Sequence, residues 1–281
     1  MPPLRTAGLT AALLLIGPLV AARAQDAPPP PLLPAPQVDP AIADEMVITA
    51  LRHLHEAFDV PASVSRIGRT DLRTGPDARS LPNALRREPG VLLQKTGPGQ
   101  SSPHIRGFTG FRTLLMLDGI RINNSVMREG PNQYWGTLDA FAVERLELTR
   151  GPASVLWGSD ASGGAVNALT RPAQAAEDWS GRWFVRYSTA ERSFLSRYEV
   201  EGGVEGEWAL RAGWSDKDFG DIKAGHGSGN LPGTGYDERD LDFRLDVPLD
   251  GGAELTLTRQ RVRQNDVPRT HTTVDAVPFE G

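Results

Sequence analysis

The side chains best suited to acid–base chemistry are Asp118, Glu144, Glu147 and His104, because carboxylates and imidazoles can transfer protons. Glu144 and Glu147 lie three positions apart in FAVERLELT, residues 141–149, where the pattern predicts a strand. Side chains three apart on a strand point to opposite faces, so these carboxylates cannot share one site. The five histidines show no Ser-His-Asp arrangement and no metal-ligand spacing. We therefore expect no enzyme, no catalytic residue, no metal ion and no cofactor.

Composition narrows the possible classes further. The 281 residues include no cysteine, which rules out disulfides, thiol nucleophiles and cysteine-based zinc sites. The formal charge of −5 gives no basic surface that would indicate nucleic-acid binding. The mean hydropathy is −0.33, and no internal apolar run reaches the roughly 20 residues of a membrane helix. A β-barrel remains possible, because its lipid-facing residues alternate with polar ones.

The N-terminus has the pattern of an export signal. Arg5 precedes a short apolar segment at residues 9–22, and Ala22-Arg23-Ala24 forms an A-x-A cleavage site. A buried helix is the alternative, and Pro18 within the apolar segment disfavours it. We predict a cleaved signal peptide at residues 1–24.

A proline-rich segment follows the cleavage site. The sequence DAPPPPLLPAPQVDP, residues 26–40, favours an extended polyproline spacer over a helix or a strand. It could instead bind a proline-recognising module. We interpret residues 25–43 as a periplasmic linker.

Short strands and brief helices are predicted from residue 60 onward. Ser80 and Pro82 fit the start of a helix over residues 81–88, which Pro89-Gly90 would end. Asp118-Gly119 is a turn-forming dipeptide between two apolar segments. Further strands are expected at residues 60–67, 91–94, 104–106, 114–117, 120–122, 141–149 and 165–170. This mixture indicates a compact α+β domain of about 110 residues.

Two long blocks carry a specific resemblance. PHIRGFTGFRTLLMLDGIRINN, residues 103–124, and VERLELTRGPASVLWGSDASGGAVNALTRPA, residues 143–173, resemble the plug domain of TonB-dependent outer-membrane receptors. The resemblance covers residues 59–173, with weaker continuity beyond. Two such blocks in the right order are far more specific than one short motif.

The resemblance implies roles for individual plug residues. Arg106 and Arg150 would face the barrel wall and pair with barrel carboxylates, since a guanidinium fork suits a partly buried bidentate pair. The alternative is that both are ordinary surface charges. The expected turn residues are Gly107, Asp118, Gly119, Gly151, Gly158, Gly163 and Gly164.

Between the linker and the plug lies a segment similar to the family's TonB box. It comprises Asp44, Glu45, Met46, Val47, Ile48, Thr49 and Ala50. Its β-branched centre has strand propensity beside an extended spacer, as expected of a segment that adds a strand to a partner's sheet. A first plug strand, or chance in an alanine-rich stretch, would give the same pattern.

Beyond residue 173 the hydrophobic period becomes two. Leu241, Phe243 and Leu245 alternate with charged residues, as on a barrel strand between lipid and a polar lumen. A soluble sandwich would alternate in the same way. Short turns at Glu205-Gly206 and residues 248–253 contrast with a long stretch at residues 216–238. We expect about five strands in residues 181–281, too few to close a barrel, and hence a truncated transmembrane β-barrel after an α+β plug.

The resemblance implies active uptake of a scarce nutrient complex across the outer membrane, with TonB, the lipid bilayer and a small iron complex as partners. The sequence around residues 101–104 and 129–134 is more similar to haem and ferric-siderophore receptors than to cobalamin receptors. Cobalamin or a saccharide is the alternative ligand, and a soluble exported binding protein the alternative class. His104 fits a packed or capping histidine better than a haem ligand. Signalling to a transcription regulator is disfavoured, because residues 25–43 are too short for an additional periplasmic domain.

Overall fold

The structure is a computed structural model that describes residues 46–47, 55–56, 62–75, 79–97, 99–123, 134–176, 178–223 and 229–267. The expected signal peptide and linker lie outside these residues. No helix in the described ranges is long and apolar enough to cross a membrane.

A five-stranded sheet is the centre of the first domain. Its strand order is β3-β8-β9-β6-β7, and β6 runs parallel to β9 while the other pairs are antiparallel. The strands are β3 (Ser63–Gly68), β8 (Val143–Arg150), β9 (Gly164–Thr170), β6 (Thr113–Leu117) and β7 (Ile120–Arg121).

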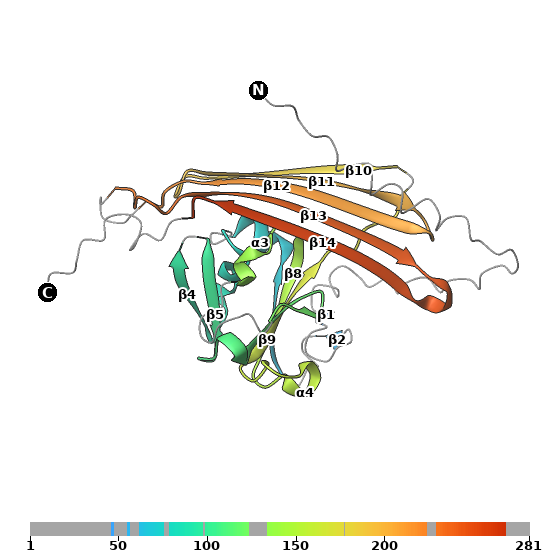
Figure 1. Cartoon of the computed structure of the whole chain (residues 1–281), viewed down its shortest axis with the longest axis horizontal. Coiled ribbons are helices and arrows are strands. Elements are labelled where there is room, and N and C mark those ends of the chain that lie inside the picture. The colour runs from blue at the N-terminus through green and yellow to red at the C-terminus, as the bar shows by residue number, and fades with distance from the viewer. Residues whose placement is uncertain are drawn as a thin grey trace, which may run out of the picture. The chain divides into compact units, whose positions relative to one another are not determined.

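Short helices and a hairpin surround this sheet (Figure 1). The hairpin joins β4 (Val91–Gly97) to β5 (Gln100–Ile105). The helices are α3 (Arg69–Thr74), η2 (Leu81–Arg87), η3 (Gly110–Arg112), η4 (Tyr134–Thr137) and α4 (Ser154–Trp157). The helix expected at residues 81–88 is a 3₁₀ helix, and Ser80 makes no side-chain cap; its hydroxyl instead lies 3.4 Å from that of Ser101.

An apolar core packs between the sheet and these helices. Leu146, Leu148 and Val166 contribute from β8 and β9, Leu72 and Leu85 from the helices, and all are essentially inaccessible to solvent. Alternation along β8 explains this, because Leu146 and Leu148 point to the same face of the sheet.

A second, open sheet holds five long antiparallel strands in the order β10-β11-β12-β13-β14 (Figure 1). They are β10 (Ser180–Ser188), β11 (Ser193–Val204), β12 (Trp208–Phe219), β13 (Tyr236–Pro248) and β14 (Glu254–Asn265). At one end the connections are short: residues 205–207, and residues 249–253 with η5 (Asp250–Gly252). At the other end, residues 220–235 form a long connection, but residues 189–192 form a short one.

The two faces of this second sheet differ in chemistry. One face exposes aromatic and aliphatic side chains, including Trp183, Tyr198, Trp214 and Leu241. Trp183 stacks on Tyr198 with ring centroids 5.9 Å apart. The opposite face carries charged side chains that are buried rather than hydrated. The expected fold class, an α+β plug followed by antiparallel strands that do not close a barrel, is confirmed.

Candidate functional site

The buried charges of the second sheet meet a carboxylate from the first domain. Asp139 lies between η4 and β8, where its Oδ1 accepts a hydrogen bond of 2.8 Å from the backbone N–H of Phe141. This short-range bond fixes the direction of the carboxylate. Asp139 is 1% exposed, and its carboxylate contacts side chains of β11 and β12.

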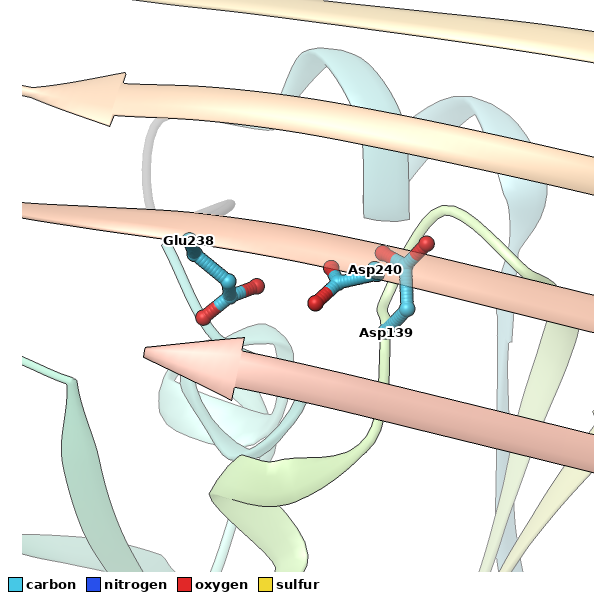
Figure 2. Close-up of side chains that lie close together, drawn as sticks. All are labelled: Asp139, Glu238 and Asp240. Carbon is cyan, nitrogen blue, oxygen red and sulfur yellow. The ribbon is translucent and has the colours of Figure 1, made fainter. Parts of the chain in front are cut away.

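Lys217 of β12 is the centre of this site. Its Nζ donates to Asp139 at 2.7 Å, to Glu238 at 2.6 Å and to Asp240 at 2.7 Å. Figure 2 shows Glu238 and Asp240 on one strand and Asp139 on a separate segment. The ammonium group therefore joins two carboxylates of β13 to one carboxylate of the first domain.

Arg197 of β11 extends the network. Its Nη1 lies 3.1 Å from Asp139 and 2.7 Å from Asp242, and it also donates to Ser215 at 3.0 Å. Ser215 in turn donates to Asp139 at 2.7 Å. Asp139 thus has three partners on two neighbouring strands, which fixes its position more strictly than one pair would.

The electrostatics of the site follow from these ion pairs. Burial alone would raise the pKa of Asp139, but the charges of Lys217 and Arg197 outweigh it and hold that pKa well below its usual range. Asp139, Glu238 and Asp240 lie close enough together to ligate a metal ion. The ammonium group of Lys217 contacts all three carboxylates, so a cationic side chain already lies between them.

A second set of ion pairs joins α3 and its neighbours to the sheet. Arg69 and Arg73 both contact one oxygen of Glu199, at 2.8 Å and 2.9 Å. Arg79 pairs with Glu191 and donates to two carbonyl groups of the sheet's long connection, those of Thr234 and Gly220. Its guanidinium also lies over the rings of Phe219 and Tyr236. Three ion pairs therefore share this interface with the Lys217 network.

The Asp118-Gly119 turn lies at another contact with the sheet. Asp118 has φ 49° and accepts hydrogen bonds from the backbone N–H and the hydroxyl of Thr170, both at 2.7 Å. Arg244 of β13 donates to the same hydroxyl at 2.9 Å. A cleft of about 510 Å³ opens here, lined by Arg145 and Trp157 among others. Asp118 is thus a turn residue of the first domain that also lies next to the second sheet.

Arg150, one of the two arginines expected to pair with barrel carboxylates, is occupied inside its own domain. Its guanidinium binds Glu88 at 2.7 Å, the Pro89 carbonyl at 2.7 Å and the Ser65 hydroxyl at 2.7 Å. The reason is geometric: the end of β8 lies beside β3 and the end of η2. Within the described residues, these partners of Arg150 all belong to the plug.

Arg106, the other such arginine, is exposed and has φ 51°. In the described part of the chain its side chain has no ion-pair partner. A lock between either arginine and a barrel carboxylate stays a prediction. The plug–sheet contacts that the structure does contain are made by other residues.

The expected turn glycines differ in what they require. Positive φ occurs at Gly107, Gly119, Gly151, Gly158 and Gly164. Gly163 has ordinary φ, but a side chain there would collide with Phe108. Its size, not its backbone conformation, is therefore what the fold needs.

Only two residues of the expected TonB box are described, and only in their backbone. Met46–Val47 forms β1, which pairs antiparallel with β2 (His55–Glu56) in a separate two-stranded sheet. The other five residues of the segment lie outside the described residues: Asp44, Glu45, Ile48, Thr49 and Ala50.

The two carboxylates of β8 that were considered for acid–base chemistry bind different arginines. Glu144 lies 3.6 Å from Arg69, and Glu147 lies 2.9 Å from Arg145.

Comparison with known proteins gives this arrangement a family. The profile described as TonB-dependent Receptor Plug Domain matches residues 56–165. The iron-regulated outer membrane virulence protein of Vibrio cholerae is 32% identical over 244 residues, which cover 81% of this chain and 35% of that relative. The chain belongs to the TonB-dependent outer-membrane receptors. The first domain is their plug, and the protein is located in the outer membrane.

Other members of the family are similar over shorter or more divergent stretches. The vitamin B12 transporter BtuB of Vibrio vulnificus is 34% identical over 136 residues, 48% of this chain and 22% of that relative. The ferric enterobactin receptor PfeA of Pseudomonas aeruginosa matches 73% of this chain and 33% of its own, with a TM-score of 0.55 and 25% identity. FpvA of P. aeruginosa has a TM-score of 0.62 at 16% identity, covering 78% of this chain and 27% of its own, and shows the shared fold. The chain spans about a third of the length of the first relative, and these relatives are transport receptors, not enzymes.

The residues of the plug–sheet contact had not been singled out from the sequence. The available signal was the alternation along β13, where Glu238, Asp240 and Asp242 all occupy one face. The alternation by itself predicts a face that lines a polar lumen. In the structure it is buried against the plug, so the charges serve to hold the plug.

Proposed function

We propose that this receptor actively imports an iron complex, a ferric siderophore or haem, across the outer membrane with energy delivered by TonB. The relative that covers most of the chain is iron-regulated, and a structural neighbour at 25% identity is a ferric enterobactin receptor. The vitamin B12 transporters match less than half of the chain. These likenesses favour iron over cobalamin.

The observation that carries the proposal is the buried ionic contact around Asp139 and Lys217. A plug inside a barrel has to stay in place at rest and yet give way during transport. Breaking an apolar interface exposes surface that water solvates poorly, whereas separated carboxylate and ammonium groups recover their hydration. A charged contact therefore suits a plug that is held but can be displaced.

Coupling to TonB would use the segment from Asp44 to Ala50. The pairing of β1 with β2 shows that residues of this segment can adopt the strand conformation. Strand addition to a partner depends mainly on backbone hydrogen bonds, and the partner would replace β2 as the neighbour of β1. Ligand binding would favour this exchange only if the ligand binds more tightly to the state in which the segment is released.

The ligand can be identified by uptake in a strain that lacks its other iron receptors. Cells with and without this receptor would be given radiolabelled iron as a panel of ferric siderophores or as haem, and radiolabelled cobalt as cobalamin. We expect receptor-dependent accumulation of one iron complex, and loss of accumulation when TonB is deleted. Accumulation of cobalamin or a labelled saccharide instead would reassign the ligand. Accumulation that does not depend on TonB, or recovery of the receptor as a soluble periplasmic protein, would contradict the proposal.

A further inference from the structure

The last described strand presents three arginines at alternate positions. Arg259, Arg261 and Arg263 of β14 all share one face of the sheet and are exposed. Their neighbours across the strand pair are Phe243, Leu241 and Arg239 respectively. Strand periodicity therefore places three guanidinium groups on the same face of the sheet as Phe243 and Leu241.

The register shows that this is the outward face. The even-numbered residues of β14 point toward the plug side, where Gln264 donates to Glu238 at 2.7 Å. Thr256 likewise donates to Asp246 at 2.8 Å. Leu255 and Leu257 share the face of the arginines and are 44% and 51% exposed. In an outer-membrane receptor, this face meets lipid.

Residues that pair across neighbouring strands form rows on this face, and these rows locate the arginines relative to its apolar side chains. Arg261 continues a row that runs through Tyr198, Trp214 and Leu241. Arg263 continues the next row, through Asp216 and Arg239, where polar side chains begin. Arg259 continues a row through Val200, Ala212 and Phe243, on the apolar side of the aromatic row. The arginines thus cross the boundary between hydrocarbon and headgroups, where tryptophan and tyrosine gather.

Charges at this depth need partners, because an unpaired arginine on the lipid face of a barrel strand is destabilising. Among the described residues, Arg259, Arg261 and Arg263 have no carboxylate within 4.0 Å. Arg239 has only a loose and exposed pair with Asp216 at 3.7 Å. The positive charge on this patch is therefore largely uncompensated by the described residues.

A groove lies beside these arginines. A shallow groove of about 340 Å³ is lined by Trp214 and Leu241 on its apolar side and by Arg239, Arg261 and Arg263 on its charged side. Asp240 also lines it but is buried, 3% exposed, with its side chain bound to Lys217 on the plug side of the sheet. It lies at the end of the sheet that carries the long connection, residues 220–235. Long connections of outer-membrane barrels are extracellular, so the groove lies at the level of the outer leaflet.

We propose that this arginine patch (Arg239, Arg259, Arg261 and Arg263) binds the phosphorylated headgroup of an outer-leaflet lipid. Guanidinium groups form bidentate, charge-assisted bonds with phosphate oxygens. Alternate strand residues are separated by about 6.6 Å, so neighbouring arginines can bind separate phosphate oxygens or separate phosphates. Trp214 and Leu241 would contact the start of the acyl chains. The groove therefore matches a ligand that is anionic at one end and apolar at the other.

The probe is lipid A, a disaccharide lipid with two phosphates, and its chemically dephosphorylated form. Receptor extracted from outer membranes would be delipidated in detergent, titrated with each lipid, and examined by native mass spectrometry for bound lipid. At about 1 kcal/mol per arginine near an anionic surface, replacing Arg259, Arg261 and Arg263 by glutamine should weaken binding about a hundredfold. The triple lysine variant keeps the charges and should lose far less. Arg192→Gln, an exposed connection arginine at the same end of the sheet, should bind like the wild type.

The wild-type receptor should also bind lipid A much more tightly than the dephosphorylated lipid. This comparison needs no variant, so it decides the question even if the triple glutamine variant fails to assemble. Equal binding of the two lipids would overturn the proposal, as expected if an acidic strand or protein partner covers the arginines. Wild-type binding by the triple glutamine variant would overturn it as well.

Discussion

The plug core and the plug–sheet contact are equally buried but chemically opposite. In the core, Leu146, Leu148 and Val166 are inaccessible to solvent and pack against other apolar side chains. At the contact, the side chains of Asp139 and Lys217 are each 2% exposed, yet both are charged. Burial is thus achieved by close packing of hydrocarbon in one region and by mutual neutralisation in the other.

This difference determines what each region can do. Apolar burial stabilises whichever hydrocarbon surfaces meet, and it is lost only when the domain unfolds. A buried ion pair adds little net stability because both charges lose their hydration, but it strongly penalises every arrangement that leaves one charge alone. The core therefore keeps the plug folded, while the contact specifies where the plug sits.

The largest effect is expected from Lys217→Met, which leaves Asp139, Glu238 and Asp240 buried together without their cation. Removing one partner of a buried pair costs about 4 kcal/mol, and here three carboxylates lose the same partner. The measurement is the free energy of unfolding of the purified receptor in detergent, from urea titration of its tryptophan fluorescence. Lys223→Met, at an exposed connection lysine, is the matched control and should change little. Equal effects of the two variants would mean that the network does not hold the plug.

A somewhat smaller loss is expected from Leu146→Ala in the plug core. Truncating a fully buried leucine costs about 3 kcal/mol, through lost burial and the cavity that remains. The effect should be confined to the plug, so limited proteolysis should cut the plug at lower urea while the barrel strands resist. Leu92→Ala is the control, because Leu92 is 69% exposed. Simultaneous loss of plug and barrel would show that the two regions do not separate as the comparison suggests.

Sequence patterns predicted the parts of the fold that depend on neighbouring residues. The Asp118-Gly119 turn is an example, since its left-handed conformation is a local property of that dipeptide. The alternation along β13 likewise gave the two faces of the sheet. Long family blocks then identified the plug, which composition alone could not do.

Contacts between distant residues were beyond such patterns. Asp139 and Lys217 are 78 positions apart, and no local feature distinguishes Asp139 from other surface carboxylates. Arg150 is a second example, because its partner Glu88 lies 62 positions earlier and no local pattern indicated that pair. The type of a charged residue indicates that it needs a partner, and only the fold determines which one.

Asp139→Asn tests the contact more gently than Lys217→Met, because Lys217 keeps two carboxylates. We expect the plug to be released from the barrel at lower urea, with a loss of about 2 kcal/mol, as for a hydrogen bond to a charged group. Release can be followed by protease access to the plug. Asp139→Glu keeps the negative charge but has a longer side chain, so it should lose less stability than Asp139→Asn.

The same contact should respond to pH. The pKa of Asp139 is lower in the folded receptor than its unfolded value of about 3.9, so its contribution is complete above about pH 5 and declines as the pH falls below that value. Wild-type plug release should therefore become easier on acidification, whereas the Asp139→Asn variant should lack this part of the response. A wild-type receptor and variant with parallel pH profiles would contradict the assigned ionisation.

The smallest effect on stability, but a decisive one on transport, is expected in the TonB box. Proline at position 47 or 48 removes a backbone donor and fixes φ, so it should prevent strand addition to TonB as well as the pairing of β1 with β2. Val47 lies outside the plug's five-stranded sheet, so Val47→Pro and Ile48→Pro should leave the unfolding of the plug unchanged. Surface binding of the ligand should also stay near wild type, while its energy-dependent accumulation is lost. Val47→Ala keeps the backbone donor and should transport nearly normally. Normal accumulation in both proline variants would show that this segment is not the TonB box, and a destabilised plug would show that it is instead a structural strand.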